Sequence, residues 1–109
     1  MSDDCTQPAA EEMRLADVLA ALADDHRRHV VRELVRSEDG VERTCTSFGL
    51  PVSKSTRSHH FKVLREAGLV RQVDRGNMSG VTLRRKDIEH RFPGLLALVD
   101  AEEKPAGRG

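Results

Sequence analysis

Apolar residues recur at the spacing of an α-helix in two stretches near the start of the chain. Residues 13–22 predict a first amphipathic helix from their apolar positions, which are Met13, Leu15, Val18, Leu19 and Leu22. Asp24 and Asp25 are suitable N-caps for a second helix, which Gly40 can end. The apolar face of this second helix consists of Val30, Val31, Leu34 and Val35. The pattern therefore predicts two consecutive helices, each with one face for a core.

A later helix is polar in its first half and apolar in its second. A short third helix is expected at residues 43–48, and the sequence FGLPVS then breaks the helical pattern. Ser53 is the natural N-cap of a fourth helix, and Gly68 is the natural residue to end it. Its apolar side chains lie only in the second half, at Phe61, Val63, Leu64 and Ala67. The first half is therefore free to contact something outside the protein.

The rest of the chain predicts a β-hairpin and a broken helix. Residues 69–75 and 80–85 are rich in Val, Thr and Leu and predict two short strands, joined by the loop at residues 76–80. Residues 87–103 have a helical pattern that Pro93 interrupts. An apolar patch follows this break, at Leu95, Leu96, Leu98 and Val99.

This order of elements is that of a winged helix-turn-helix. We expect an α+β domain that is mainly α, with about five helices and a two-stranded hairpin wing. The domain is expected at residues 13–103, between disordered tails at residues 1–12 and 104–109. A helix with a polar N-terminal half can enter a DNA major groove, and its N-terminal amides favour phosphate. A hairpin beside it can reach the backbone or the minor groove.

Charge is unevenly distributed, although the formal net charge of the 109 residues is zero. Residues 51–91 hold 10 Lys/Arg and 4 Asp/Glu, a balance of +6, whereas residues 1–50 hold 6 and 11, a balance of −5. The polar-fronted helix therefore lies in the one basic segment. Such a patch is typical of nucleic-acid binding. The alternative interpretation is a solvated charged face with no partner.

The sequence disfavours several other classes of protein. No apolar run approaches the roughly 18 residues of a membrane span, and the acidic N-terminus lacks the apolar segment of a signal peptide. Two cysteines do not form a disulfide framework, so we expect a cytoplasmic protein. Catalytic motifs such as Gly-x-Ser-x-Gly, the P-loop and His-Glu-x-x-His are absent from the sequence, and we expect no enzymatic activity.

Two segments resemble the ArsR/SmtB family of regulators. The sequence LADDHRRHVVREL at residues 22–34 is similar to the second helix of that family. The sequence SHHFKVLREAGLV at residues 58–70 is the more specific match, because it resembles the family's recognition helix with Phe61 in place of the usual Leu. The resemblance covers roughly residues 13–85. It implies a homodimeric winged helix that binds an imperfect inverted repeat in double-stranded DNA, usually as a repressor released by a ligand, often a transition metal.

The resemblance also implies which residues contact DNA. Base and phosphate contacts fall on the front of the recognition helix, at Lys54, Ser55, Thr56, Ser58 and His59. Lys62 is expected to meet phosphate further along, and Arg75 and Asn77 to do so from the wing. Arg57 departs from the family, which has an apolar residue there. Either Arg57 extends outward and adds a phosphate contact, or the short third helix packs differently.

Adjacent histidines in one helix point about 100° apart and rarely bind one metal ion together. We therefore expect one of His59 and His60 to face DNA. We expect the other to be half-buried and hydrogen-bonded within the fold.

Other side chains are candidate ligands for an effector metal such as nickel or zinc. The candidate sets are Cys5 with Cys45, His26 with His29, and His90 with Asp100 and Glu103. Each set also has an ordinary interpretation: a small buried cysteine, surface histidines beside Arg27 and Arg28, or a solvated charged helix end. The metal-binding pattern of the last helix in metal-sensing relatives is not matched here. The alternative is that this chain binds no effector directly.

The first and last helices carry more apolar residues than so small a core should absorb. In the ArsR/SmtB family these two elements form the two-fold interface, which here implies Leu15, Val18, Leu19, Leu95, Leu96 and Val99. Such a dimer would place two recognition helices about one duplex turn apart. The alternative is a winged helix used for protein contact, working with a second regulatory protein that senses the ligand or metal, and acting as an activator.

Overall fold

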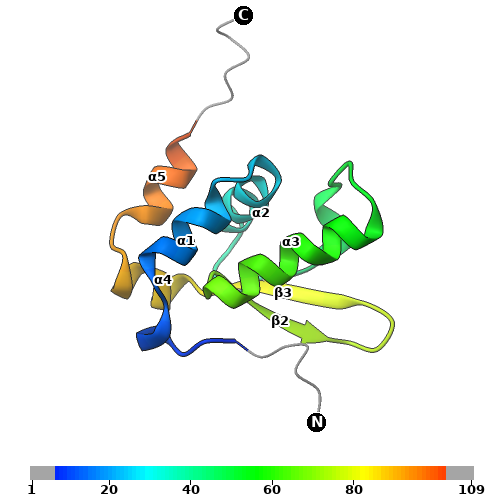
Figure 1. The fold of residues 1–109 in the computed structure, drawn as a ribbon, viewed down its shortest axis with the longest axis horizontal. Helices are drawn as coiled ribbons and strands as arrows, with labels where there is room; N and C mark the ends of the chain where they lie inside the picture. Colours follow the sequence, from blue (N-terminus) through cyan, green and yellow to red (C-terminus); the bar gives the residue numbers. More distant parts are fainter. Residues whose placement is uncertain (1–6, 103–109) are drawn as a thin grey trace, which may run out of the picture.

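The computed structural model describes residues 7–102, and over this range the chain forms a winged helix-turn-helix (Figure 1). The α-helices are α1 (Leu15–Leu22), α2 (Asp25–Val35), α3 (Lys54–Ala67), α4 (Arg85–Arg91) and α5 (Leu95–Ala101). The strands are β1 (Glu42–Thr44), β2 (Val70–Asp74) and β3 (Ser79–Leu83), and two short 3₁₀ helices are η1 (Ala10–Glu12) and η2 (Cys45–Phe48). The predicted architecture is confirmed.

Local capping explains where the two central helices begin and end. The Asp24 carboxylate accepts hydrogen bonds from the backbone N–H groups of His26 (2.8 Å) and Arg27 (3.1 Å) at the start of α2. The Ser53 hydroxyl accepts one from Thr56 N–H at the start of α3 (3.2 Å). Gly68 ends α3 with a φ of 93°, a left-handed conformation that favours glycine. The caps predicted at these three positions are confirmed.

The sheet has three antiparallel strands in the order β1-β3-β2, one more than the predicted hairpin. The wing itself agrees with the prediction, because β2 and β3 pair from Val70–Leu83 to Asp74–Ser79. The difference lies at residues 43–48, where a helix was expected. Instead, β1 pairs with β3 (Glu42 opposite Thr82), and only η2 is helical. Pairing with a distant strand overrides the local preference of these residues.

The core lies between the helices and the inner face of the wing. Its largest fully buried side chains include Phe61 and Leu64 of α3, Leu34 of α2 and Val81 of β3. Each such side chain contributes roughly 1.5–3 kcal/mol by leaving water. The rings of Phe48 and Phe61 pack with centroids 5.8 Å apart, which attaches η2 to α3. The apolar half of α3 is thus fixed to the core and its polar half is left outside.

The N-terminal boundary of the domain differs from the prediction of a disordered tail to residue 12. Arg84 donates a hydrogen bond to the carbonyl of Pro8 (2.7 Å), and the Glu12 carboxylate accepts one from Ala9 N–H (2.8 Å). These bonds place residues 7–12 on the domain. The rest of the predicted N-terminal tail, residues 1–6, and the predicted C-terminal tail, residues 104–109, lie outside the described residues.

The C-terminal helical region is broken as predicted. α4 ends before Pro93, and Gly94 turns the chain with a φ of 92° into α5. Three arginines on one face of α2 hold the end of α5. Glu102 accepts from Arg28 and Arg32, each at 2.8 Å, and Asp100 accepts from Arg36 at 2.7 Å. α5 therefore packs along α2 and beside α1 (Figure 1).

Candidate nucleic-acid interface

α3 presents a polar surface at its N-terminal end and a buried surface behind it. The exposed side chains include nearly all those predicted to contact DNA, namely Lys54, Ser55, Thr56, Ser58, His59 and Lys62. Arg57 is half-buried, whereas His60, Phe61 and Leu64 are covered. The Ser53 cap leaves the first turn of α3 at the molecular surface. The protein therefore presents a continuous polar helix front.

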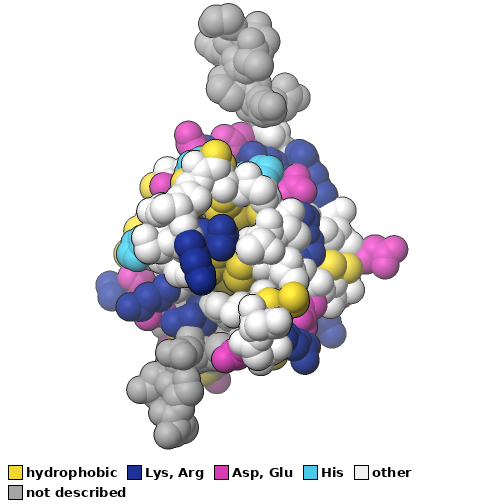
Figure 2. Space-filling model, turned by 90° about the vertical axis from the view of Figure 1, so that its right-hand side faces the viewer, with side chains coloured by type: hydrophobic (Ala, Val, Ile, Leu, Met, Phe, Trp, Pro, Cys, Tyr) yellow, Lys and Arg dark blue, Asp and Glu magenta, His cyan; other side chains and the backbone are white. Residues whose placement is uncertain are grey.

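A hollow of about 640 Å³ separates this helix front from the wing, and we call it the α3–wing hollow. Its walls come from β1, η2, α3, β2 and the tip of the wing. The lining residues are Thr44, Cys45, Thr46, Lys54, Arg57, Ser58, Phe61, Lys62, Arg65, Glu66, Gln72, Asn77, Met78 and Ser79. Figure 2 views this end of the molecule, with Lys and Arg side chains beside the hollow and hydrophobic side chains within it.

The cations around the hollow are not neutralised. Within residues 7–102, no carboxylate forms an ion pair with Lys54, Arg57, Lys62 or Arg65. Arg75, which was predicted to contact phosphate, differs from them. Its guanidinium makes two hydrogen bonds to the Glu42 carboxylate, at 2.7 and 3.0 Å. Asn77 is exposed at the wing tip.

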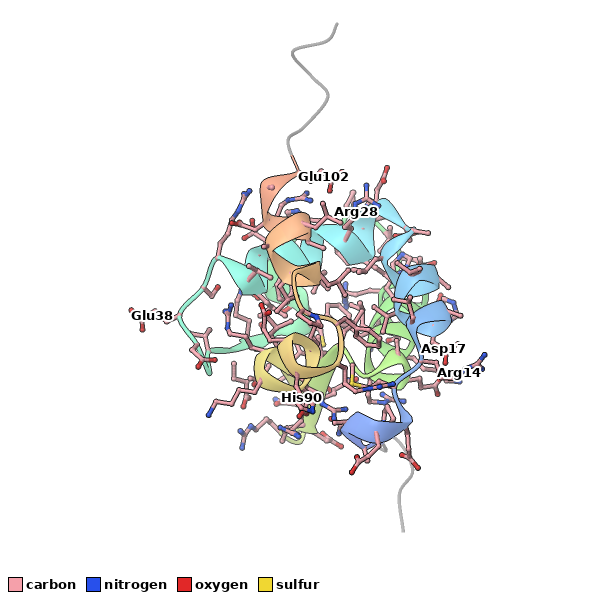
Figure 3. All side chains as sticks on the ribbon, turned by 90° about the vertical axis from the view of Figure 1, so that its left-hand side faces the viewer. Arg14, Asp17, Arg28, Glu38, His90 and Glu102 are labelled. Atoms are coloured by element: carbon pink, nitrogen blue, oxygen red, sulfur yellow. The ribbon has the colours of Figure 1, made fainter. Side chains whose placement is uncertain are left out.

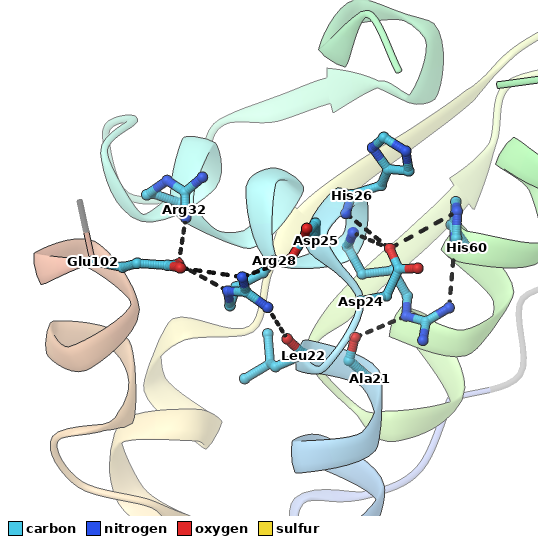
Figure 4. Close-up of polar contacts among 10 residues, drawn as sticks. Ala21, Leu22, Asp24, Asp25, His26, Arg28, Arg32, His60 and Glu102 are labelled. Carbon is cyan, nitrogen blue, oxygen red and sulfur yellow. Dashed lines mark hydrogen bonds and ion pairs between the residues drawn. The ribbon is translucent and has the colours of Figure 1, made fainter. Parts of the chain in front are cut away.

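The two adjacent histidines have separate environments, as predicted. His59 is exposed, whereas His60 is 6% exposed and faces the turn between α1 and α2. Arg27 Nη1 donates to His60 Nδ1 (3.1 Å), and Asp24 Oδ1 lies 4.0 Å from Nε2 (Figure 4). Burial lowers the pKa of His60, the charges of Arg27, His26 and His59 lower it further, and Asp24 opposes them. His60 is thus a neutral acceptor that ties α3 to α2.

Comparison with known proteins decides the class. Residues 22–73 match a family described as a helix-turn-helix domain, a range that contains α2, α3 and most of β2. The chain is also 33% identical over 93 residues to YceK of Bacillus subtilis (strain 168), described as an uncharacterized HTH-type transcriptional regulator. That match covers 84% of this chain and 91% of the relative. The chain belongs to the HTH-type transcriptional regulators.

This regulator is a DNA-binding protein of the helix-turn-helix class, and α3 lies entirely within the matched range. The C-terminal half of the match contains the entire polar helix front described above. No helix within residues 7–102 is long and apolar enough to cross a membrane.

The regulator's predicted metal ligands are not gathered in the structure. Among residues 7–102, no group of three or more His, Cys, Asp or Glu side chains is placed to hold a metal ion. His90 lies on α4, far from the end of α5 where Glu102 lies (Figure 3). Asp100 is bound to Arg36. Glu103 and Cys5 lie outside the described residues.

The single described cysteine lies in the α3–wing hollow. Cys45 is half-buried and packs against the core. Burial raises its thiol pKa to about 11, and the nearby charge of Arg57 only partly opposes this effect. The group is therefore a neutral thiol at physiological pH and behaves as a small apolar side chain.

His26 belongs to the other predicted metal-binding pair, His26 with His29. Its ring centroid lies 5.8 Å from the ring centroid of His60.

The predicted dimer residues divide into two groups. Val18 and Leu96 are 0% and 1% exposed and Val99 is also buried, so they fill the regulator's own core. A covered side chain has little surface left for a partner, and the predicted interface itself stays a prediction. Leu15 and Leu19 are half exposed, and Leu95 is partly buried. Leu19, Leu95, Leu98 and Val99 line an apolar groove of about 490 Å³ between α1 and α5.

Sequence reasoning missed Arg65 as a residue of this interface. Arg65 lies on the same side of α3 as Arg57 and Phe61, and all three line the hollow. The signal was present, because positions four residues apart share a helix face. Arg65 continues this row from the exposed front of α3 to the place where the core meets the hollow.

Proposed function

We propose that this regulator is a dimeric repressor of the ArsR/SmtB type that binds an inverted-repeat operator through α3 and the wing. The observation that supports the proposal is the exposed polar front of α3 beside cations that lack ion-pair partners. The sequence resemblance to that family supplies the finer assignment. Repression would follow from occupancy of promoter DNA.

The front of α3 suits a DNA major groove. A helix of 14 residues is about 21 Å long, and its N-terminal half would lie against base edges. In this arrangement Ser55, Thr56, Ser58 and His59 contact bases, whereas Lys54, Arg57 and Lys62 contact phosphates. The free N–H groups and positive dipole end at the start of α3 favour the backbone further.

The hollow suits the DNA strand between two grooves. A helix in a major groove and a hairpin in the next minor groove lie on either side of one sugar-phosphate strand. That strand would pass over the α3–wing hollow, where the unpaired cations gather. Asn77 would contact the strand from the wing tip, while Arg75 would first have to exchange Glu42 for a phosphate.

The apolar groove between α1 and α5 is the surface that supports a dimer. Leu19 and Leu98 are 52% and 70% exposed, and both line the groove. A two-fold axis beside the groove would bury these side chains against the same elements of a second copy. It would also present two α3 helices to two half-sites.

Titration of the protein with a fluorescent duplex from its own upstream region tests the DNA interface. Affinity should fall steeply with salt, with a log–log slope of about 0.9 per phosphate contact. Lys54→Ala and Arg57→Ala should each weaken binding to all sequences and reduce this slope by about 1. His59→Ala should instead change the preferred sequence.

Lys86→Ala is the matched control, because it removes an exposed cation from α4, away from the hollow. It should leave affinity unchanged. Equal effects of Lys86→Ala and Lys54→Ala would contradict the assigned interface and indicate non-specific attraction.

The effector of the proposed repressor is a separate question. Nickel or zinc binding by His90, Asp100 and Glu103 stays a prediction, which calorimetric titration tests with His90→Ala as the control. An absence of heat with either metal would remove it. Co-purification of a second regulatory protein would instead favour a partner that carries the sensing site.

A further inference from the structure

We propose that the α3–wing hollow binds a small organic anion with an apolar body, and that this ligand and DNA exclude one another. The second part of the proposal rests on the proposed function, because it requires α3 to be the DNA-reading helix. The first part does not depend on DNA binding and can be tested alone.

The hollow has the size and mixed lining of a ligand site. Its volume of about 640 Å³ lies inside the range of roughly 300–1,000 Å³ that is usual for small-molecule pockets. Phe61, Met78 and Cys45 contribute apolar surface, whereas Ser58 and Gln72 contribute polar groups. A pocket of this kind holds a ligand by its apolar body and orients it through a few polar contacts.

Arg65 is the buried group that indicates an anion. It is 9% exposed, and its Nη1 donates to Gln72 Oε1 at 2.9 Å. Its Nε is buried and has no hydrogen-bond partner in the described part of the chain. A guanidinium remains charged at any physiological pH, and buried charges are normally paired. No carboxylate among residues 7–102 pairs with it, so an acid group in the hollow would supply the missing charge.

Three further cations strengthen this preference. Lys54, Arg57 and Lys62 line the same hollow without ion-pair partners in the described chain. Among residues 7–102, Glu66 is the only acidic residue of the lining, and it is exposed. The local field therefore favours a carboxylate, sulfonate or phosphate group.

The apolar side chains distinguish an organic anion from a simple inorganic one. A bare phosphate would satisfy the cations but leave the exposed side chain of Met78 and the half-buried Cys45 in contact with water. The Cys45 thiol is neutral, so it adds apolar surface and no repulsion. An aromatic carboxylate would place its ring against these groups and its acid group near Arg57 and Arg65.

Exclusion of DNA follows from shared residues. Lys54, Arg57, Ser58 and Lys62 line the hollow and are also predicted DNA contacts. A ligand that neutralises these cations removes the charge that attracts phosphate, and it occupies the path proposed for the backbone. Because coupling between two binding events is reciprocal, DNA must weaken the ligand as much as the ligand weakens DNA.

The probe for the test is 2-naphthoate, titrated into ¹⁵N-labelled full-length protein and followed by amide chemical shifts. Saturable shifts should appear at Cys45, Ser58, Lys62 and Met78. The neutral analogue 2-naphthalenemethanol and inorganic phosphate should each bind at least about tenfold more weakly. Equal binding of inorganic phosphate would overturn the claim for an organic anion, and shifts centred on Leu19 and Leu98 would overturn the site.

Two variants test the residues. Arg65→Met keeps the side-chain length and removes the charge, and Met78→Glu adds a carboxylate at an exposed position that the core does not use. Each should reduce naphthoate affinity by about tenfold or more. Arg36→Met, an arginine of α2 outside the hollow, is the matched control and should bind normally. Unchanged affinity in Met78→Glu would overturn the proposal even if Arg65→Met fails to fold.

Competition then separates the two hypotheses. Operator duplex should displace naphthoate, and naphthoate should lower duplex affinity by the same factor. If duplex binds and naphthoate does not, the inference fails while the proposed function stands. If naphthoate binds and no duplex does, the site stands and the proposed function fails. Simultaneous binding without coupling would overturn mutual exclusion.

Discussion

His60 shows how one side chain joins the DNA-facing helix to the rest of the protein. Its neutral ring accepts from Arg27 and lies beside Asp24, the residue that caps α2. The orientation of α3 therefore depends on the turn between α1 and α2. The exposed His59, one position earlier, makes no comparable bond among the described residues, although the two rings lie 6.3 Å apart.

The lowered pKa of His60 predicts a pH dependence of stability. The unfolded chain takes up a proton at His60 near its ordinary pKa of about 6.5, whereas the folded chain resists protonation to lower pH. Stability should therefore fall as the pH drops below about 6.5 toward the folded-state value. Urea unfolding of wild type and His60→Gln between pH 5 and 8 measures this, and the variant should lose part of the slope.

His59→Gln is the control for this experiment, because His59 is exposed. It should keep most of the wild-type slope, because the charge of His59 is the smallest of the causes that lower the pKa of His60. If both variants reduce the slope equally, the effect comes from general charge and the assignment to the buried ring is wrong.

At the scale of elements, the contact between α2 and α5 is electrostatic as well as apolar. Arg28, Arg32 and Arg36 lie four residues apart and hold Glu102 and Asp100. The hydrogen bond from Arg28 is the main cause that lowers the pKa of Glu102. These pairs are partly exposed, so each one contributes little to global stability. Their role is to fix the end of α5.

Glu102→Gln should therefore loosen α5 without unfolding the protein. Amide hydrogen exchange in α5 should become faster, while exchange in α3 should stay unchanged. The melting temperature should change by only a few degrees, because ion pairs this exposed to water contribute little to global stability. Glu89→Gln, an exposed acid on α4, is the control, and faster α5 exchange in this variant would contradict the role given to Glu102.

Elements defined by local signals were predictable from the sequence. Asp24, Ser53 and Gly68 mark helix ends through bonds within a few residues, and the wing has its own turn and β-branched residues. β1 was not predictable, because its pairing with β3 joins residues about 40 positions apart, such as Glu42 and Thr82. The placement of residues 7–12 against the domain also depends on a distant residue, because Arg84 donates a hydrogen bond to the Pro8 carbonyl.

The candidate site was predictable in part for a similar reason. Helical periodicity correctly predicted that His59 and His60 have different environments, and the family resemblance placed His59 on the exposed front. Periodicity identifies an apolar face, but it does not say whether that face meets the protomer's own core or a partner. Val18 and Leu96 were therefore assigned to an interface and lie in the core. The hollow also needs η2 and the wing tip, which only the folded chain brings beside α3.

At the scale of the whole molecule, the proposed repressor depends on assembly. Leu98→Glu places a charge in the exposed apolar groove between α1 and α5, where it should prevent association of two copies. Light scattering should show a monomer, and affinity for a full inverted repeat should fall by at least about tenfold while affinity for one half-site is unchanged.

Ala97→Glu is the matched control, because it adds the same charge at an exposed neighbouring position of α5 that does not line the groove. It should remain dimeric. A monomeric wild type, or a dimeric Leu98→Glu, would contradict an interface at this groove.

The uneven pairing of cations has a consequence for how the molecule approaches a nucleic acid. The sequence has no net charge, so a distant polyanion exerts little overall pull on it. Among residues 7–102, four cations without ion-pair partners gather beside α3 and the wing, namely Lys54, Arg57, Lys62 and Arg65, while many other arginines are neutralised by neighbouring acids. Separated charge of this kind gives the molecule a dipole moment, and a dipole in an external field experiences a torque. For the DNA interface proposed above, this torque would turn the protein before capture, so that α3 would already face the grooves.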